Sequence, residues 1–217
     1  GDNAQREFSG FQKVLQEQRS QIEGFDLVHF VTSAFNQLFT GYLEYFELEH
    51  LYPLLHRDLC LRHIDSYDNP GTLMGAASQS WIRTCFFFMS PRVLYTINPL
   101  NPLRDESRFF DANGNFLAEA PLDRGYQQNI EKWLSGKKIQ GATWHGKIRS
   151  GSEFAEKALT ILNEHMLSIR LRKMGVRLVD YYWMMTKHQA LEERFDTPVA
   201  EEMEQVRVRS NGLFGGD

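Results

Sequence analysis

The segment from Leu27 to Glu47 constrains the fold more than any other part of the chain. Its polar residues recur at intervals of three or four, so on an α-helix they would share one edge; they are His29, Ser33, Asn36, Thr40, Glu44 and Glu47. Most of the other residues are aliphatic or aromatic, whereas an exposed helix has a broad polar face. The pattern predicts a helix over 27–47 that neighbouring elements cover on most of its circumference.

The composition indicates a folded domain with a sizeable core. Of the 217 residues, 42% are hydrophobic and 13% are aromatic, which argues against a disordered chain. We predict a single α+β domain over 1–217, with a helical part at about 3–64 and a mixed part at about 72–207. The chain begins with Gly rather than Met. This is compatible with the loss of an upstream signal or anchor, so the localisation stays open.

Helical spacing recurs in four other segments. It predicts an amphipathic helix over 3–23, a short helical piece over 54–64 and another near Gln127–Leu134. The clearest pattern covers 152–174, where apolar residues form one face and Gly175 supplies a helix stop. This helix and the helix at 27–47 are the two long amphipathic helices of the predicted fold.

Strands are predicted in the middle and near the end of the chain. Aromatic and β-branched residues on both faces of Ser80–Met89 predict a buried strand, with a helix over Gly75–Phe88 as the alternative. Alternation predicts a strand at Arg92–Asn98, and Val176–Met185 is apolar on both faces. We therefore expect an antiparallel sheet of about four or five strands, with the two long helices packed on one face.

Two segments carry turn signals. Asn113-Gly114 lies between short apolar runs and is typical of a hairpin turn with positive φ at both central residues. The run Ser66–Gly71 contains Asp, Asn, Pro and Gly, which favour a turn as well.

The polar edge of the predicted helix suggests two kinds of site. His29, Ser33, Asn36, Thr40 and Glu44 would line a pocket for a small apolar ligand if a groove follows that edge. The simpler explanation is that this edge faces water.

Glu47 and His50 form a Glu-x-x-His pair, which would place a carboxylate and an imidazole on one helix face as a metal site requires. A di-metal bundle needs two such pairs, and the sequence holds one. A helix end that emerges into solvent explains the residues more simply, and we assign no cofactor.

Two ionisable residues occupy apolar surroundings. His165 lies at the centre of the apolar face of the helix at 152–174, and Asp180 lies within the apolar strand near the end of the chain. A buried carboxylate needs a cation or several hydrogen-bond donors. The two could form an acid–base pair, although such residues are more often satisfied parts of a core.

Basic residues surround an aromatic one in the segment 137–149, which could follow a phosphate backbone; they are Lys137, Lys138, Trp144, Lys147 and Arg149. The chain carries 24 Lys and Arg against 28 Asp and Glu, a net charge of -4. This balance argues against nucleic acid as a partner.

These patterns lead to three hypotheses about function. The first is a non-catalytic binding or assembly domain that acts through a protein partner, through self-association or through a small apolar ligand. The second is an enzyme with acid–base or metal chemistry around Glu47, His50, His165 and Asp180, and the third is a nucleic-acid contact. The sequence carries no common nucleotide-binding, hydrolase or zinc-ribbon motif. It also contains no transmembrane pattern, and it leaves the pairing of Cys60 with Cys85 open.

Overall fold

The computed structural model describes residues 6–33, 35, 58–136, 148, 151–181, 183 and 184, with residues 67–70 described by their backbone alone. These residues belong to two compact units, each assembled from separate stretches of chain. Unit 1 is drawn from Gly1–Glu17, Ser66–Trp81 and Ile97–Arg170. Unit 2 is drawn from Gln18–Asp65, Ile82–Thr96 and Leu171–Asp217. The single domain over 1–217 stays a prediction.

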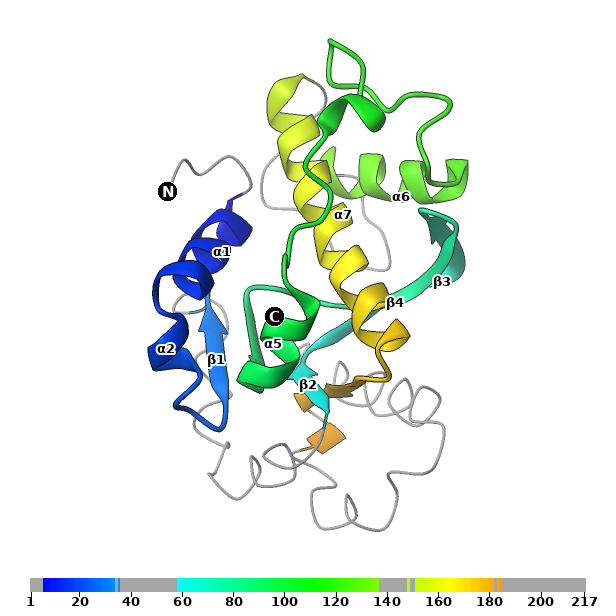
Figure 1. Ribbon diagram of the computed structural model, residues 1–217. Helices are drawn as coiled ribbons and strands as arrows, with labels where there is room; N and C mark the ends of the chain where they lie inside the picture. Colours follow the sequence, from blue (N-terminus) through cyan, green and yellow to red (C-terminus); the bar gives the residue numbers. More distant parts are fainter. Residues whose placement is uncertain are drawn as a thin grey trace. The chain divides into compact units, whose positions relative to one another are not determined.

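Helices and strands are mixed along the chain, which confirms the α+β class. The described helices are α1 (Glu7–Glu17), α2 (Arg19–Ile22), α5 (Pro91–Ile97), the 3-10 turn η3 (Glu106–Arg108), α6 (Arg124–Leu134) and α7 (Ser152–Lys173) (Figure 1). The described strands are β1 (Val28–Val31), β2 (Leu59–Arg62), β3 (Ile64–Leu73), β4 (Ala76–Ile82), β5 (Phe86–Met89) and β6 (Arg177–Asp180). Among these helices none is both long and apolar enough to cross a bilayer.

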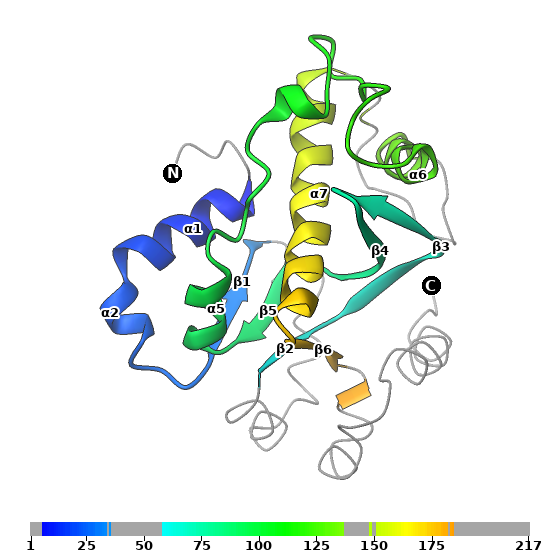
Figure 2. The same ribbon diagram turned by 45° about the vertical axis from the view of Figure 1, so that its right-hand side comes forward.

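Unit 2 is built on a four-stranded sheet with the order β1-β5-β2-β6 (Figure 2). Strand β5 pairs antiparallel with β1 and with β2, whereas β6 pairs parallel to β2. All four residues of β5 are buried, because this strand has a neighbour on each edge and apolar side chains on each face. The number of strands agrees with the prediction, and the sheet is mostly antiparallel as expected.

Unit 1 contains most of the β3–β4 ribbon, α6 and the greater part of α7. One apolar core joins these elements to the irregular segment before α6; it includes Leu73, Leu103, Phe109, Phe110, Tyr126, Ile130, Leu134, Phe154, Leu159 and Leu162. The side chain of Asn163 on α7 is buried in this core. It accepts a hydrogen bond from Leu103 N and donates one to Leu103 O, each at 2.9 Å, so it fixes the irregular segment against the helix.

The helix predicted over 27–47 is wrong at its start. Residues 28–31 form β1, in which Val28 lies opposite Met89 and Val31 opposite Phe86. The ring of Phe30 stacks on Phe87 with centroids 4.8 Å apart. Pairing with β5 therefore overrides the helical spacing, as tertiary context often does for short β-branched and aromatic runs. Ser33 and Phe35 are helical, and residues 36–47 lie outside the described part, so only the second long helix, α7, is confirmed.

Three shorter predictions are also wrong. Leu59–Arg62 is strand β2 rather than a helical piece, and the turn expected at Ser66–Gly71 lies within strand β3. Arg92–Asn98, predicted as a strand, falls almost entirely in helix α5. The reason is Ser90-Pro91: the Ser90 hydroxyl accepts a hydrogen bond from Val93 N at 3.3 Å, and proline suits the first helical position.

The turn at Asn113-Gly114 is confirmed, but its predicted geometry is not. Of its two central residues, only Gly114 has a positive φ, at 76°. The carboxylate of Asp111 accepts hydrogen bonds from the backbone nitrogens of Asn113 and Asn115 at 2.8 and 2.9 Å. An aspartate-centred loop, closed by a single bridge between Phe110 and Phe116, replaces the two-residue hairpin.

Replacement of Gly114 by Ala will lower the free energy of unfolding by about 2 kcal/mol, because φ is positive there and a Cβ would overlap the Gly151 carbonyl. Gly10→Ala is the matched control. Gly10 lies inside α1, where a Cβ meets no atom within 4 Å. That change will therefore raise stability by about 0.5–1 kcal/mol. Urea unfolding measures both, and wild-type stability in Gly114→Ala would contradict the close approach.

Candidate functional site

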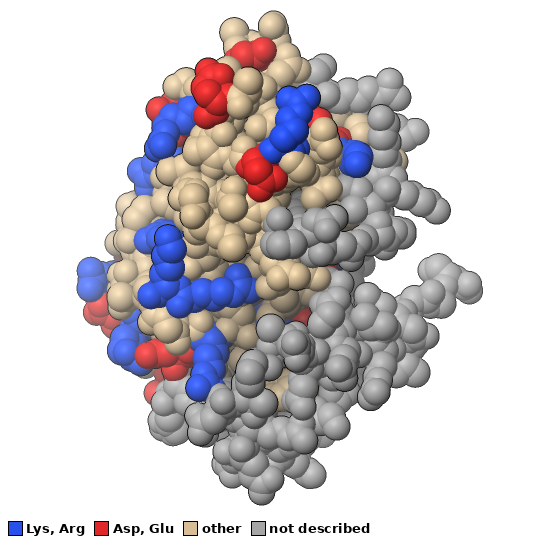
Figure 3. All heavy atoms as spheres, turned by 90° about the vertical axis from the view of Figure 1, so that its right-hand side faces the viewer, with Lys and Arg blue, Asp and Glu red and all other residues tan. Residues whose placement is uncertain are grey.

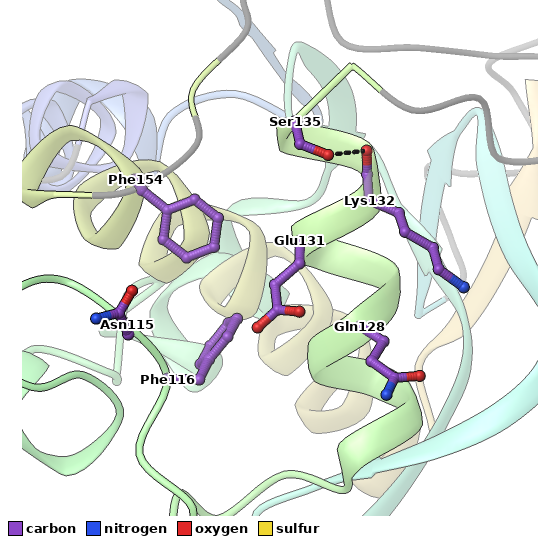
Figure 4. A pocket seen from close by; sticks show the side chains of 7 residues that line it. All are labelled: Asn115, Phe116, Gln128, Glu131, Lys132, Ser135 and Phe154. Atoms are coloured by element: carbon purple, nitrogen blue, oxygen red, sulfur yellow. Dashed lines mark hydrogen bonds between the residues drawn. The ribbon is translucent and has the colours of Figure 1, made fainter.

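A pocket of about 300 Å³ lies in unit 1 between α6, the start of α7 and the loop before residue 117 (Figure 4). We call it the α6 pocket. It is lined by Asn115, Phe116, Gln128, Glu131, Lys132, Ser135 and Phe154. Three separate elements therefore contribute side chains to one small hollow.

Asp123 holds in place α6, the helix that supplies three of the seven residues of the pocket lining. One carboxylate oxygen of Asp123 caps the helix by accepting a hydrogen bond from Tyr126 N at 2.9 Å. The other accepts hydrogen bonds from Thr72 N and from the Thr72 hydroxyl, so the cap also ties α6 to β3. Tyr126, Ile130 and Leu134 bury one face of the helix, which leaves another face for the pocket.

The apolar wall of the pocket is a contact between two phenylalanine rings. The centroids of Phe116 and Phe154 are 5.8 Å apart, and the rings are inclined by 84° in an edge-to-face arrangement. Phe110 packs against both, at 4.8 Å from Phe116 and 6.4 Å from Phe154. Phe154 is only 4% exposed, so this wall is anchored in the core of unit 1.

Two groups on the polar side of the pocket make hydrogen bonds within the protein. The side-chain nitrogen of Asn115 donates to the Asp111 carboxylate at 3.2 Å, and the Ser135 hydroxyl donates to Lys132 O at 3.1 Å. Figure 4 shows the Glu131 carboxylate directed toward Phe116, whereas the Lys132 side chain extends away from it. The lining thus combines apolar rings with hydrogen-bond donors and acceptors, including one carboxylate and one ammonium group.

Unit 2 contains a second candidate, which we call the charge cluster: Arg62, His63, Asp65, Arg83 and Asp180. His63 lies between two carboxylates, with Nδ1 3.3 Å from Asp180 and Nε2 3.5 Å from Asp65. Arg83 binds Asp65 through both Nε and Nη2. Burial alone would raise the pKa of Asp65, but the positive charge of Arg83 and the contact with His63 hold it well below its usual range.

Two members of the charge cluster are almost inaccessible to solvent. Asp180 is 2% exposed and accepts hydrogen bonds from Ile64 N at 2.8 Å and Trp183 N at 3.4 Å. The sequence argument that this carboxylate needs donors or a cation is therefore satisfied. Arg62 is fully buried, with its guanidinium 4.5 Å from the centroid of Phe86 and a hydrogen bond to His63 O at 3.2 Å.

The predicted site residues are distributed over both units. His29 lies on β1 and stacks on Phe88 at 3.9 Å, and burial lowers its pKa to about 4. His165 is fully buried in unit 1, with its ring 4.0 Å from Trp81 and 5.3 Å from Tyr126. Asp180 belongs to unit 2, so its pairing with His165 stays a prediction. Ser33 is exposed.

The other predicted site residues lie outside the described part of the chain: Asn36, Thr40, Glu44, Glu47, His50, Lys137, Lys138, Trp144, Lys147 and Arg149. Within the described part, no group of three or more His, Cys, Asp or Glu side chains is placed to hold a metal ion. On the face drawn in Figure 3, acidic and basic side chains are interspersed. Cys60 and Cys85 are not joined by a disulfide bond, and burial raises the pKa of Cys60.

Sequence reasoning missed the α6 pocket. One available signal was the spacing of Gln128, Glu131, Lys132 and Ser135, which places four polar residues on one helical face. The approach of the aspartate-centred loop and of Phe154 to that face is a long-range contact that local spacing does not reveal.

No protein-family model, curated protein or solved structure matches the chain.

Arg83→Met will destabilise the protein by about 2 kcal/mol near neutral pH, because it leaves the largely buried Asp65 carboxylate without its main cation. The lowered pKa of Asp65 means that the ion pair stabilises the fold above the unfolded-state value of about 4 and is lost as pH falls further. The difference from wild type will therefore shrink in acid. Urea unfolding at a series of pH values measures it.

Arg92→Met is the matched control, since its ion pair with Asp58 lies at the surface, with side-chain exposures of 71% and 39%. It will change stability by less than about 0.5 kcal/mol. Equal effects of the two substitutions would contradict a special role for the buried pair.

Proposed function

We propose that this chain is a non-catalytic binding domain and that the α6 pocket holds a small organic ligand. The observation that carries the proposal is the meeting of an aromatic wall with polar side chains around one hollow. Binding sites for small molecules commonly combine an apolar lining with a few polar groups that fix orientation. A volume of about 300 Å³ corresponds to a small ligand.

The contacts that hold the pocket lining in place favour a site that is already formed before a ligand binds. Asp123 fixes the start of α6, the Phe110–Phe116–Phe154 contacts fix the wall, and Gly151 N donates to Asn113 O at 3.1 Å beside the loop. A site that needs little ordering on binding loses less conformational entropy, so more of its contact energy contributes to affinity.

A protein partner or self-association has weaker support. Among the described residues the exposed large hydrophobic side chains are Val14, Phe25, Val31 and Met174. Of these Val14 belongs to unit 1 and the other three to unit 2. Scattered exposed apolar residues are ordinary on monomeric proteins. The nucleic-acid hypothesis rests on the segment 137–149, of which the structure describes only Ile148.

An acid–base enzyme is the second candidate, and the charge cluster is the observation that favours it. Asp180 contacts Nδ1 of His63, an arrangement that orients an imidazole for proton transfer. His63 is 9% exposed, so a substrate would reach it only through a small opening.

A screen for hydrolysis of nitrophenyl esters and phosphates tests this second candidate. If the chain is such an enzyme, wild-type protein and Arg92→Met will turn over one of these substrates and His63→Gln will lose the activity. Equal rates for all three proteins would remove His63 from any such reaction.

Gln128→Trp will abolish small-molecule binding at the α6 pocket, because Gln128 is exposed and lines the hollow that an indole would fill. Asn129→Trp is the matched control, since Asn129 is the next residue of α6 and does not line the pocket. A fragment screen by NMR, with each hit repeated on both variants, measures the effect. If hits bind Gln128→Trp as tightly as wild type, the α6 pocket is not the site.

A further inference from the structure

We propose that Asn113 is a modification site, at which the side-chain amide is lost by spontaneous deamidation when the aspartate-centred loop opens and is protected while the loop is closed. The site goes beyond the proposed function, because the reaction needs water and no other ligand. Three features of the loop carry the proposal: the Asn-Gly dipeptide, the exposure of Asn113, and the contacts that hold the peptide group between Asn113 and Gly114.

Deamidation of an asparagine is an intramolecular reaction with the backbone. The nitrogen of the next residue loses its proton and attacks Cγ of the asparagine. The Cγ–Nδ2 bond then breaks, and ammonia leaves with that proton. Water opens the resulting succinimide ring at either carbonyl, which gives aspartate or isoaspartate. A glycine in the next position favours the attack, because it has no Cβ beside the nitrogen and its backbone is the least restricted.

Asn113 has the sequence and the exposure that this reaction needs. It is followed by Gly114, and its side chain is exposed, so water can reach the amide. Asn115 is also exposed in the same loop, but it is followed by Phe116, whose side chain hinders the backbone nitrogen. Of the two asparagines in this loop, Asn113 is therefore the one that forms a succinimide.

The closed loop withholds the reacting nitrogen. Gly114 N donates a hydrogen bond to Asp111 O at 2.9 Å, and Asn113 O accepts one from Gly151 N at 3.1 Å. The peptide group between Asn113 and Gly114 is thus held at both ends. Attack on the Asn113 side chain requires this group to turn, which breaks the bond to Asp111 O. The reaction consequently waits for the loop to open.

The isoaspartate product does not fit the closed loop. Isoaspartate directs the chain through the former side chain and lengthens the backbone before Gly114 by one carbon. There is no room for extra atoms here, because even a Cβ on Gly114 would lie 2.2 Å from the Gly151 carbonyl oxygen. Asn115 and Phe116 follow directly in the chain, so the modification also displaces two residues of the α6 pocket lining.

Peptide mapping by mass spectrometry tests the proposal on the full chain, incubated at mildly alkaline pH with and without urea. Asn211-Gly212 is a second Asn-Gly dipeptide and gives the reference rate for the unfolded chain. In urea Asn113 will react within about twofold of Asn211, because the same dipeptide determines both rates. Without urea Asn113 will react at least about tenfold more slowly than in urea, since loop opening then limits the rate.

Asp111→Ala supplies the mutational arm. It leaves the Asn-Gly dipeptide unchanged but removes the carboxylate that accepts hydrogen bonds from Asn113 N and Asn115 N. The rate without urea will rise about tenfold, and the rate in urea will not change. Asp105→Ala is the matched control, because Asp105 accepts from Ser107 N at 3.1 Å in a similar turn outside the loop. It will leave the rate at Asn113 unchanged.

Hydrogen exchange of the Gly114 amide measures loop opening in the wild-type chain, independently of whether Asp111→Ala folds. Low concentrations of urea will raise the exchange rate and the deamidation rate in parallel. A deamidation rate that is equal with and without urea would show that the loop does not protect Asn113. A folded Asp111→Ala with the wild-type rate would exclude the carboxylate as the group that keeps the loop closed. If Asn113 stays intact in urea while Asn211 reacts, Asn113 is not a modification site.

Discussion

The carboxylate of Asp123 joins the parts of unit 1 on which the pocket depends. One oxygen supplies the N-terminal cap of α6, and the other accepts hydrogen bonds from the backbone and hydroxyl of Thr72 on β3. Gly71 packs closely beside this junction, where a Cβ would meet the carboxylate of Asp123 at 3.1 Å and the side chain of Tyr126 at 3.0–3.1 Å. The position and rotation of α6 are thereby set, and with them the direction in which Glu131 points.

Local sequence signals predicted the elements that local forces determine. Helix α7 covers Ser152–Lys173, close to the predicted 152–174, and Gly175 follows it with a φ of 77°. Helix α6 was also expected near its observed position. The wrong predictions fall where a partner distant in the sequence determines the secondary structure. The run Val28–Val31 fits a helical stripe, but β5 provides a strand partner that covers Phe30 and His29 with stacked rings. The helix α5 could have been found, because Ser90-Pro91 is a recognisable helix start.

The same limit applies to the sites. The sequence showed that Asp180 needs donors, and the structure supplies them from the backbone of Ile64 and Trp183. The sequence could not show that the side chain of His63 lies beside Asp180, because β2 and β6 are brought together only by sheet pairing. The α6 pocket was harder to predict from the sequence. Phe154 was assigned to a helix face and Asn115 to a turn, and only their approach to α6 creates a hollow.

The carboxylates of the two units have different surroundings, and this difference favours the α6 pocket as the binding site. Asp65 and Asp180 are held by Arg83, His63 and backbone nitrogens, so their charge is already compensated within unit 2. Glu131 and Lys132 are both exposed and line the α6 pocket beside its aromatic wall, so each can meet a polar or charged group of a ligand. Exposed ion pairs contribute little to affinity, so contact of the ligand with the Phe116–Phe154 wall must supply most of it.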